Sequence, residues 1–596
     1  MIKVTDYIVS FLAKNGVKHV FMLSGGGAMH LVDSVGKSDK IEYVCTLHEQ
    51  AAAIAAEGYA RTSGKIGVAV VTSGPGGTNT LTGVAGAWVD SIPVLVISGQ
   101  VKIETTVLMN PKLRQLGDQE INIVDIARPI TKYAVMVTDK NRIKYHLQKA
   151  LHLAQSGRPG PVWIDVPLDI QGAFVDEKSL KEYDYADKLV GLSSKNGSVF
   201  ELLEKSQRPV IIAGNGIRLS NAVSEFGALV EKAKIPVIAT FAGYDIVPGT
   251  CPYYFGRYGS VGQRAANFVV QNSDLILAIG ARLNIRAVSY NWKAFAREAK
   301  KIVVDIDAAE LEKPSLKIDV PVRQDAKSFI SDILEAVDSR NLTSKDGWLS
   351  KCREYKTKYP NIDSERISVK KFVDSYFFFK KLSMLSAEGA IFTFGNGTAC
   401  VSSYQSFDVK PDQRVIVNSG YASMGYGLPA AIGACVANNK KEVICVTGDG
   451  SIQMNIQELQ TIVQYKLPIK IFLLNNQGYI SIRNTQKTHF NGRIVGASKE
   501  SGVGLPDMVK IATAYGIEAA KINNHEELET QISKVLSYPG AIICQVELDP
   551  EEEMYPKLSS HVNEDGTMVS KPLEDLYPFL DREEFRQNML IKPLDG

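Results

Sequence analysis

The sequence predicts an α/β protein of three domains, each with a parallel sheet flanked by helices. Short apolar runs of strand length alternate with segments of helical character, which is typical of a parallel sheet covered by helices. Polar stretches interrupt this alternation twice and divide the chain into three units. Two of these units repeat the same order of motifs at a constant spacing. The length of 596 residues also suits about three to four domains.

The first unit opens with a predicted helix. Thr5 is its expected N-terminal cap, apolar residues share one face, and Gly16 ends it. A short strand at 19–23 then runs into Ser24-Gly25-Gly26-Gly27. Strands and helices continue to alternate up to a last strand at 162–167. The unit therefore reads as one complete parallel sheet with its helices.

Two polar zones mark the boundaries of the second unit. The first, about 176–198, predicts a linker, and the second, about 341–358, leads into the third unit. The strands expected between them are 209–213, 236–240, 275–279 and 302–305. From about 549 the chain is rich in proline and charge, which predicts an ordered or semi-ordered tail. The predicted division is 1–175, 195–345 and 365–550, followed by a tail over 551–596.

The first and third units contain an internal repeat. Val71-Thr72, a glycine-rich turn and Ile92-Pro93 correspond to Val446-Thr447, a glycine-rich turn and Leu467-Pro468. Each pair is offset by the same 375 residues, since 447 − 72 and 468 − 93 are equal. The two units are therefore predicted to be copies of one fold, although a chance match over two short segments is the alternative.

Composition excludes several classes of partner. The net charge is +2 and no dense run of Lys and Arg occurs, so neither a nucleic acid nor an anionic membrane is an expected partner. Seven cysteines show no paired metal-ligand spacing, which indicates reduced thiols and a cytoplasmic protein. The first residues lack the apolar core of a signal peptide. No apolar run approaches the roughly 18 residues that span a bilayer.

The strongest functional signal is Gly448-Asp449-Gly450 after one predicted strand and Asn475-Asn476 after the next. Ligands of open α/β sheets lie outside the carboxyl ends of the strands, so Asp449 and Asn476 should project into one crevice. Their oxygens suit a hard cation such as Mg²⁺, which commonly also binds phosphate. The glycines let the backbone approach that phosphate closely. An isolated Gly-Asp-Gly is more often a turn, but the second strand end favours the functional interpretation.

A second signal is Glu49, which follows a predicted strand at 42–46 and opens an alanine-rich helix. By itself, Glu49 also fits an acid that the helix macrodipole favours at an N-terminus. Over residues 1–550, however, the chain resembles the acetolactate synthase branch of the thiamine diphosphate enzymes. The motifs that carry the resemblance are His48-Glu49-Gln50, Glu57-Gly58-Tyr59-Ala60-Arg61, Thr72-Ser73-Gly74-Pro75-Gly76-Gly77-Thr78-Asn79, Asp90-Ser91-Ile92-Pro93, Gly157-Arg158-Pro159-Gly160-Pro161-Val162 and Met424-Gly425-Tyr426-Gly427-Leu428-Pro429-Ala430-Ala431.

The resemblance implies a pyrimidine-binding first domain, a Rossmann-like central domain of the FAD-binding type and a third domain that binds diphosphate and Mg²⁺. Glu49 would hydrogen-bond the aminopyrimidine and so promote removal of the proton from the thiazolium carbon. Met424 would hold the cofactor bent, although an ordinary core methionine is the alternative. Asp449, Asn476 and the carbonyl of Gly478 would bind the metal. In this family Glu49 and the metal site come from different subunits, which implies a homodimer or homotetramer.

The same resemblance supplies the candidate binding residues. For thiamine diphosphate with Mg²⁺ they are Gly25, Gly26, Gly74, Asn79, Gly397, Thr398, Met424, Gly448, Asp449, Gly450, Ser451, Asn476, Gly478 and Tyr479. For FAD they are Gly280, Arg282, Arg286 and Asp305. The family has Phe-Asp-Asp-Arg where this chain has Leu283-Asn284-Ile285-Arg286, so the same domain without flavin stays an alternative.

The acceptor site departs most from the family. Gln119 matches an active-site glutamine, implied here to be catalytic, and Arg286 matches the arginine that binds the acceptor carboxylate. Thr485 replaces the tryptophan that shapes the pocket for 2-oxobutyrate, and methionines are replaced by the serines Ser481 and Ser260. Small hydroxyls in place of large apolar walls should open and polarise the pocket. His30 replaces a proline and could reach the site, or could be a packing or surface histidine.

These features predict a carboligase that depends on thiamine diphosphate and Mg²⁺, with FAD as a further cofactor. Its expected donor is a small 2-oxo acid, most simply pyruvate, and its expected acceptor is a carbonyl compound. The open pocket favours a larger, more polar acceptor, and the tail segment 571–576 resembles that of related enzymes associated with sugar and surface-polysaccharide pathways. Together they imply a keto-sugar nucleotide, as in branched-sugar carboligases. A true acetolactate synthase that uses a second pyruvate is one alternative. A non-catalytic binding or regulatory member of the fold is another, but the joint presence of Glu49, Asp449 and Asn476 opposes it.

Overall fold

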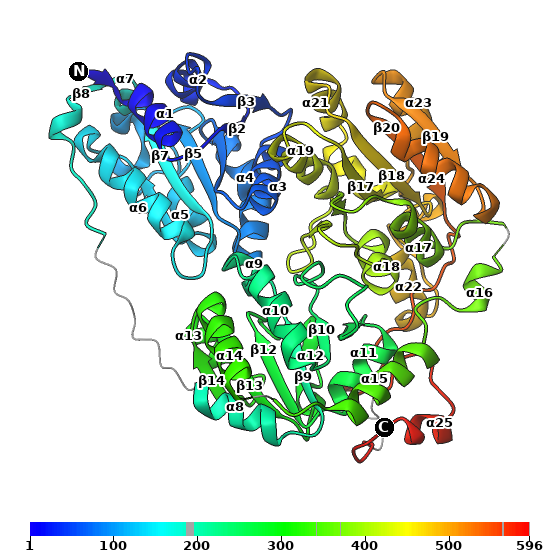
Figure 1. The fold of residues 1–596 in the computed structure, drawn as a ribbon. Coiled ribbons are helices and arrows are strands. Elements are labelled where there is room, and N and C mark those ends of the chain that lie inside the picture. Colours follow the sequence, from blue (N-terminus) through cyan, green and yellow to red (C-terminus); the bar gives the residue numbers. More distant parts are fainter. Residues whose placement is uncertain (186–195, 341, 370, 563–565, 595–596) are drawn as a thin grey trace.

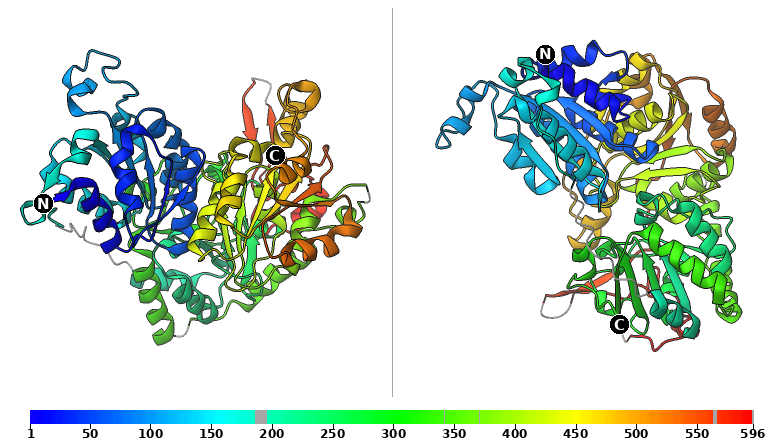
Figure 2. Two further views of the ribbon diagram at one scale, coloured as in Figure 1. Left: turned by 90° about the horizontal axis from the view of Figure 1, so that it is seen from above. Right: turned by 60° about the vertical axis from the view of Figure 1, so that its left-hand side comes forward.

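The structure is a computed structural model that describes residues 1–185, 196–340, 342–369, 371–562 and 566–594 (Figure 1). Three six-stranded parallel sheets form its framework, and helices cover them. The predicted fold class is confirmed. Figure 2 shows the N-terminal part (blue) and the C-terminal part (yellow to orange) beside one another, with the central part (green) below both. The exact domain boundaries stay a prediction.

The N-terminal sheet has the order β3-β2-β4-β5-β7-β6. Its strands are β2 (His19–Met22), β3 (Glu42–Cys45), β4 (Gly67–Val71), β5 (Val94–Gln100), β6 (Tyr133–Met136) and β7 (Val162–Pro167). The helices around it are α1 (Val4–Lys14), α2 (Met29–Gly36), α3 (Glu49–Ser63), α4 (Pro75–Asp90), α5 (Ile123–Ala127), α6 (Ile143–Gln155) and α7 (Leu168–Gly172).

The predicted cap of α1 is wrong. The N-cap is Lys3, and it makes no side-chain cap hydrogen bond. Lys3 ends β1 (Ile2–Lys3), which pairs with β8 (Phe174–Val175), and the Val4 amide donates to the Ala173 carbonyl at 2.9 Å. A tertiary contact therefore satisfies an amide that a cap would otherwise serve. The Thr5 hydroxyl donates to the carbonyl of Gln171 instead.

The C-terminal sheet has the order β16-β15-β17-β18-β20-β19. Its strands are β15 (Ile391–Phe394), β16 (Arg414–Val417), β17 (Val443–Gly448), β18 (Ile469–Asn475), β19 (Glu518–Ile522) and β20 (Ile542–Glu547). Numbered within their own units, both outer sheets read 2-1-3-4-6-5. The strands β4 and β5 correspond to β17 and β18, as the offset of 375 residues predicts. The internal repeat is therefore a duplicated fold and not a chance match.

The central sheet has a different order, β11-β10-β9-β12-β13-β14. Its strands are β9 (Pro209–Ala213), β10 (Val237–Ala239), β11 (Tyr254–Arg257), β12 (Leu275–Ile279), β13 (Lys300–Asp305) and β14 (Val320–Arg323). Within the unit this reads 3-2-1-4-5-6, the order of dinucleotide-binding sheets. Successive strands are added on one side of β9 and then, from β12 onwards, on its other side. Such folds bind their ligand at this switch point.

The two polar zones have different outcomes. Part of the first, 186–195, lies outside the described residues, and its end forms the start of α8 (Asn196–Lys205). The second was read as a polar connection, but most of it is α15 (Asp346–Lys358). Trp348, Cys352 and Tyr355 are buried on one face of α15. The helix is therefore amphipathic, and the charged residues of its outer face made the segment look like a polar connection.

The predicted tail is ordered wherever the structure describes it. It contains a two-stranded ribbon of β21 (Ser560–Val562) and β22 (Met568–Ser570) and the helix α25 (Arg582–Gln587). Apolar side chains of the tail are buried in the core that covers the central sheet, and these are Leu573, Phe585, Met589 and Ile591. In Figure 1 the tail (red) runs beside α15 and α11 (Arg264–Gln271).

The two outer units meet through α3 and α19 (Gly427–Ala437) (Figure 1). Both helices are rich in alanine and glycine, so their backbones approach closely. A Cβ atom on Gly433 would collide with the Ala55 carbonyl, and one on Gly58 would collide with the backbone of Ala430. The small residues around Glu49 in the sequence therefore serve this crossing between the two units.

Candidate active site

The two strand-end motifs of the C-terminal sheet do meet in one cavity. Asp449 begins α20 (Asp449–Ile452) directly after β17, and Asn476 follows β18. Both side chains are buried and both line the same cavity. The Asp449 carboxylate accepts from the amides of Gly450 at 2.7 Å and Gly478 at 3.0 Å. Burial nonetheless raises the pKa of Asp449 to about 6.

The donor set of this cavity fits Mg²⁺. The Oδ1 atom of Asn476 is buried without a hydrogen-bond partner, while its Nδ2 donates to the Thr398 hydroxyl. A buried orphan acceptor is costly, and a cation beside it and beside Asp449 would remove that cost. No three His, Cys, Asp or Glu side chains of the described chain gather as a metal-binding group. The expected set contains only one such residue, because an amide and a carbonyl complete it.

The remaining candidates for the diphosphate half surround these two residues. Glycine is required at two of them. Gly397 has a φ of +63° at the start of α18 (Thr398–Ser406), and a Cβ on Gly450 would collide with the Tyr479 ring. The Ser451 hydroxyl accepts from the Gly425 amide at 3.0 Å and so fixes the chain next to Met424. The candidates that line the cavity are Gly397, Thr398, Met424, Gly448, Asp449, Gly450, Ser451, Asn476, Gly478 and Tyr479.

A second group of candidates gathers at the carboxyl edge of the N-terminal sheet. Glu49 is buried at the first position of α3, and its Oε2 accepts from Asn79 Nδ2 at 2.9 Å. Gly74 has a φ of +55°, and its backbone lies against the carbonyl of Gln119. Gly25 packs equally closely on Thr72, whereas the Cβ position of Gly26 is open. Glu49, Asn79, Gly74, Gly25 and Gln119 therefore share one edge of the sheet.

The two groups do not meet within one chain. The described residues that line the cavity around Asp449 begin at Arg286 and end at Ile482, so none comes from the N-terminal unit. The back of α3 packs on α19, while Glu49 bonds to Asn79 at its own sheet edge. A single chain therefore holds the metal half and the Glu49 half of a site as separate parts.

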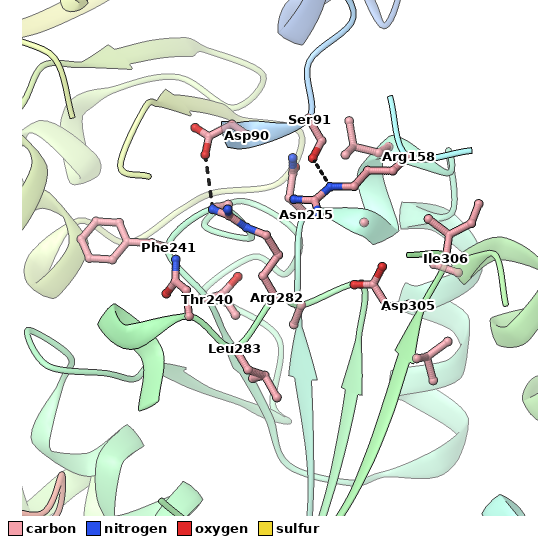
Figure 3. A pocket seen from close by; sticks show the side chains of 18 of the residues that line it. Asp90, Ser91, Arg158, Asn215, Thr240, Phe241, Arg282, Leu283, Asp305 and Ile306 are labelled. Carbon is pink, nitrogen blue, oxygen red and sulfur yellow. Dashed lines mark hydrogen bonds and ion pairs between the residues drawn. The ribbon is translucent and has the colours of Figure 1, made fainter. Parts of the chain in front are cut away.

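A second cavity lies at the switch point of the central sheet (Figure 3). It encloses about 1090 Å³, part of it open to solvent. Gly280, Arg282, Arg286 and Asp305 all line it. Gly280 has a φ of +56° and touches the backbone of Gly216. Burial raises the pKa of Asp305, which ends β13.

Charged residues from the N-terminal unit close this central cavity. Arg158 donates to Ser91 and pairs with Asp307 and Glu310. Arg282 faces Asp90 across 3.7 Å, and the Oδ1 of Asp90 has no hydrogen-bond partner (Figure 3). Asp90 and Arg158 belong to sequence motifs, but no function was predicted for them. A charged residue among small ones was the only sign in the sequence, and the fold is needed to show that both side chains face this cavity.

Arg286 is the one predicted residue that lines both cavities. Its guanidinium lies 4.9 Å from the centre of the Phe241 ring, and Phe241 stacks on Tyr404. Within the described residues this guanidinium makes no hydrogen bond or ion pair. The segment Leu283-Asn284-Ile285, which departs from the family pattern, has a structural role next to Arg286. Leu283 is buried, and Asn284 caps the short helix α12 (Ile285–Val288).

Two of the three replaced acceptor residues, Ser481 and Thr485, lie on α22 (Ile480–His489), whereas Ser260 lines neither cavity. Ser481 lines the cavity, and Thr485 is exposed one turn later and donates to the Ser481 carbonyl at 3.0 Å. Cys400 also lines this cavity and was missed, because a lone cysteine gave no signal. His30 lies against Gly172 in α7 and lines neither cavity.

Comparison with known proteins agrees with this arrangement. Residues 2–126 match the N-terminal TPP binding domain of thiamine pyrophosphate enzymes, residues 197–333 match their central domain, and residues 395–546 match their C-terminal TPP binding domain. The chain belongs to the thiamine pyrophosphate enzyme family. The match of all three domains, in this order, confirms the predicted family.

Curated relatives cover nearly the whole chain. The acetolactate synthase large subunit of Buchnera aphidicola subsp. Schizaphis graminum is 35% identical over 92% of this chain and 95% of the relative. The probable acetolactate synthase large subunit of Methanocaldococcus jannaschii is 34% identical over 93% of both. The isozyme 1 large subunit of acetolactate synthase from Escherichia coli is 30% identical over 92% of this chain and 95% of the relative.

These findings establish the class of enzyme. The protein is a thiamine diphosphate-dependent enzyme of the decarboxylase and carboligase type, similar to acetolactate synthases. The non-catalytic alternative is therefore set aside. None of the described helices is both long and apolar enough to cross a bilayer.

Proposed function

We propose that this protein joins the two-carbon unit of pyruvate to an anionic carbonyl acceptor, with thiamine diphosphate and Mg²⁺ as cofactors. The observation that carries this proposal is Arg286. Arg286 is half-buried, and its unpaired guanidinium lines the cavity that Met424 and Asp449 also line. An arginine fork without a partner is a strong ligand for carboxylate or phosphate. The acceptor is thus held by charge next to the diphosphate half of the site.

The residues around the cavity have distinct tasks in this proposal. Thiamine diphosphate, when bound, supplies the carbanion chemistry. Asp449, Asn476 and the Gly478 carbonyl would hold Mg²⁺, which neutralises the diphosphate. Met424 would bear on the cofactor from one wall of the cavity. Glu49 would hold and return a proton at the aminopyrimidine, with Asn79 fixing the orientation of its carboxylate at 2.9 Å.

A homodimer or homotetramer follows from the separation of the two halves. One chain offers Asp449 in a cavity that Glu49 does not line. A second copy that places its Glu49 edge, with Gln119, over this cavity would complete the site. Exposed apolar side chains lie on both halves and suit such a contact. They are Leu47, Leu108, Met109, Leu113 and Leu116 on the N-terminal unit and Tyr421, Met454 and Ile482 on the C-terminal unit.

For the central cavity the proposed ligand is FAD. Its support is the 3-2-1-4-5-6 sheet and the cavity at its switch point, where such folds bind dinucleotides. Asp305, at the end of β13, lines this cavity. A yellow protein whose bound chromophore absorbs near 450 nm (about the value for an oxidised flavin) supports FAD. A colourless and fully active protein contradicts it.

The acceptor that we favour is larger and more polar than 2-oxobutyrate. Ser481 lines the cavity and Thr485 lies exposed beside it, so this wall is small and hydroxylated. A keto-sugar nucleotide combines a carbonyl, hydroxyls and phosphate charge, and it therefore suits both this wall and Arg286. A true acetolactate synthase is the competing function, because pyruvate also carries the carboxylate that Arg286 needs and the relatives named above are acetolactate synthases.

An acceptor screen decides between these two functions. The enzyme, loaded with thiamine diphosphate, Mg²⁺ and FAD, is given pyruvate as donor and either no second substrate, 2-oxobutyrate or keto-sugar nucleotides. We expect a coupled product with a keto-sugar nucleotide at a higher kcat/KM than acetolactate formation. If acetolactate from two pyruvates forms faster than any other product, the competing function is correct. A cytoplasmic location, from the seven free thiols, remains part of the proposal.

A further inference from the structure

We propose that the C-terminal tail positions Arg286, acting through Asn267 and the turn Gly259-Ser260. This inference rests on the proposed function, because it concerns the arginine that holds the acceptor. The tail is called here the C-terminal strap, residues 551–562 and 566–594 of the described chain. No part of the strap lines either cavity, so its contribution must pass through other residues.

The last step of the connection holds the backbone of Arg286. The Ser260 amide donates to the Arg286 carbonyl at 2.9 Å, and the Ser260 hydroxyl donates to the same oxygen at 3.2 Å. Gly259, with a φ of +127°, lies so close that a Cβ on it would meet this carbonyl oxygen at 2.6 Å. One short turn therefore fixes the main chain from which the Arg286 side chain extends between the two cavities.

The strap contacts this turn from the other side in two ways, directly through Leu558 and indirectly through Asn267. The Leu558 amide donates to the Ser260 carbonyl at 2.7 Å. Asn267, which is 1% exposed, accepts from the Gly259 amide at 2.9 Å and donates to the Gly259 carbonyl at 3.1 Å. The same amide group donates to the Leu573 carbonyl at 2.8 Å. Asn267 therefore joins the strap to the turn with one side chain.

The helix that carries Asn267 is built to hold the strap. Arg264, Asn267 and Gln271 lie on one face of α11, because their spacing is three and four residues. Arg264 donates to the carbonyls of Leu576 and Pro578, and Gln271 donates to Glu574. The polar face of α11 is thus occupied by the strap along its whole length, and its middle residue is the one that reaches the turn.

The side chain of Arg286 depends on this support. Its guanidinium has only the face of Phe241 as a described contact, which restrains it in one direction. Its position along the cavity wall is then set by its backbone. A displacement of about 1 Å in a group that binds the reacting partner can lower turnover by about a hundredfold. A loosened turn should therefore weaken acceptor binding and leave the donor half of the reaction intact.

The chain offers a matched pair of variants for the test. Asn267→Ala removes the link between strap and turn. Asn588→Ala removes an asparagine of equal burial, 1% exposed, which bonds Tyr359 and ties the strap to α15 rather than to the turn. Pyruvate serves as donor and 2-oxobutyrate as a small anionic acceptor, both with the fully loaded enzyme. The measurements are the KM for 2-oxobutyrate, single-turnover CO₂ release from pyruvate, and amide hydrogen exchange.

For Asn267→Ala we expect the KM for 2-oxobutyrate to rise about tenfold, since lost hydrogen bonds of this kind are worth about one power of ten. CO₂ release should stay close to that of wild type, because the loss of an interaction with the acceptor does not act on the donor step. Exchange should accelerate at residues 258–262 and 285–288. Asn588→Ala should change neither the KM nor the exchange of these two segments. The inference is overturned if the two variants have equal KM values for 2-oxobutyrate. It is also overturned if Asn267→Ala slows CO₂ release by the same factor by which it raises this KM.

Two further outcomes are covered. If Asn267→Ala does not fold, Ser260→Ala replaces it, because it removes only one hydroxyl bond to Arg286; an unchanged KM then overturns the inference, and a rise supports it. If the wild-type enzyme couples pyruvate to no anionic acceptor, the proposed function fails. The exchange comparison still judges the strap in that case, because it needs no substrate.

Discussion

The N-terminal and C-terminal units share a strand order but carry different functional residues at their corresponding crevices. At the crevice after β17 and β18 the C-terminal unit places a buried carboxylate and an orphan amide oxygen, Asp449 and Asn476. The corresponding crevice after β4 has the turn Ser73-Gly74-Pro75-Gly76-Gly77 and no metal ligand. Its acid, Glu49, comes from the start of α3 instead. A duplicated fold therefore fixes where a ligand can bind, and the few residues after each strand decide what is bound.

The largest expected effect separates the two units by removing the acid of the first. Glu49→Gln should lower turnover by about 10²–10⁴-fold, the range for loss of a general acid-base group. Binding of thiamine diphosphate, followed by titration calorimetry, should persist, because the diphosphate half lies in the other unit.

Glu458→Gln is the matched control for this change. Glu458 is also buried, at the start of α21 (Glu458–Tyr465), and accepts from the Leu47 amide. Its variant should keep turnover close to that of wild type. Unchanged pyruvate consumption by Glu49→Gln would refute the assignment of Glu49.

The second effect tests the metal half alone. Asp449→Asn removes the one carboxylate of the proposed Mg²⁺ set and should weaken apparent Mg²⁺ affinity by at least about 10–100-fold, the range for loss of a residue that only supports a metal ligand. Excess Mg²⁺ should restore part of the activity. Asp507→Asn, at the cap of α23 (Met508–Ala514) in the same unit, should leave the Mg²⁺ dependence unchanged. An identical Mg²⁺ titration for wild type and Asp449→Asn contradicts the assignment.

The third effect concerns the contact that joins the two units. Gly433→Ala places a Cβ against the Ala55 carbonyl and should lower the free energy of unfolding by about 1–3 kcal/mol. Gly227→Ala in α10 (Val223–Ala233) meets no atom within 4 Å and should raise it by about 0.5–1 kcal/mol through helix propensity. Chemical denaturation measures both. Effects of the same sign would contradict the close crossing of α3 and α19.

The last effect exploits a difference between the two sheet cores. Asp165 in β7 is fully buried between Ser98 and Gln100, and burial raises its pKa to about 7. The residue with the same pairing in the C-terminal sheet is Gln545, opposite Leu473. The folded state thus binds a proton that the unfolded state, with a pKa of 3.8, releases between these values. The contribution of Asp165 to stability is present below about pH 4 and falls as the pH rises towards about 7.

Asp165→Asn should remove this dependence. The wild-type free energy of unfolding should carry a slope from this group of at most about 1.4 kcal/mol per pH unit between pH 4 and 7, and the variant should lack that component. Denaturation at pH 5, 6 and 7 measures it. Parallel curves for the two proteins would show that Asp165 stays ionised.

The sequence was most informative where local rules decide the outcome. Buried parallel strands are short apolar runs, so β9, β12 and β7 were predicted with their full bounds. Residues that directly follow a strand must lie at the sheet edge, and this placed Asp449 and Asn476 in one cavity. The constant offset of 375 residues predicted the duplicated topology, because no insertion separates its two matched segments.

The failures all involve tertiary contacts. The cap of α1 is supplied by the Ala173 carbonyl, which is distant in sequence. The helix α15 has a largely charged composition, and its buried residues become visible only against the central core. Asp90 and Arg158 reach the central cavity from another unit, and no spacing along the chain encodes that approach. The roles of the cofactor-binding residues stay predictions until ligands are bound.

Arg286 forms part of the wall of both cavities, and this has an evolutionary consequence. Under the proposed function, a mutation there would act on two traits at once, the preference for an acceptor and the retention of the ligand in the central cavity. Neither trait could then be selected through this position independently of the other. Changes of acceptor should therefore accumulate first at positions that touch one cavity alone. Ser481, which lines the cavity around Asp449 and not the central one, is such a position.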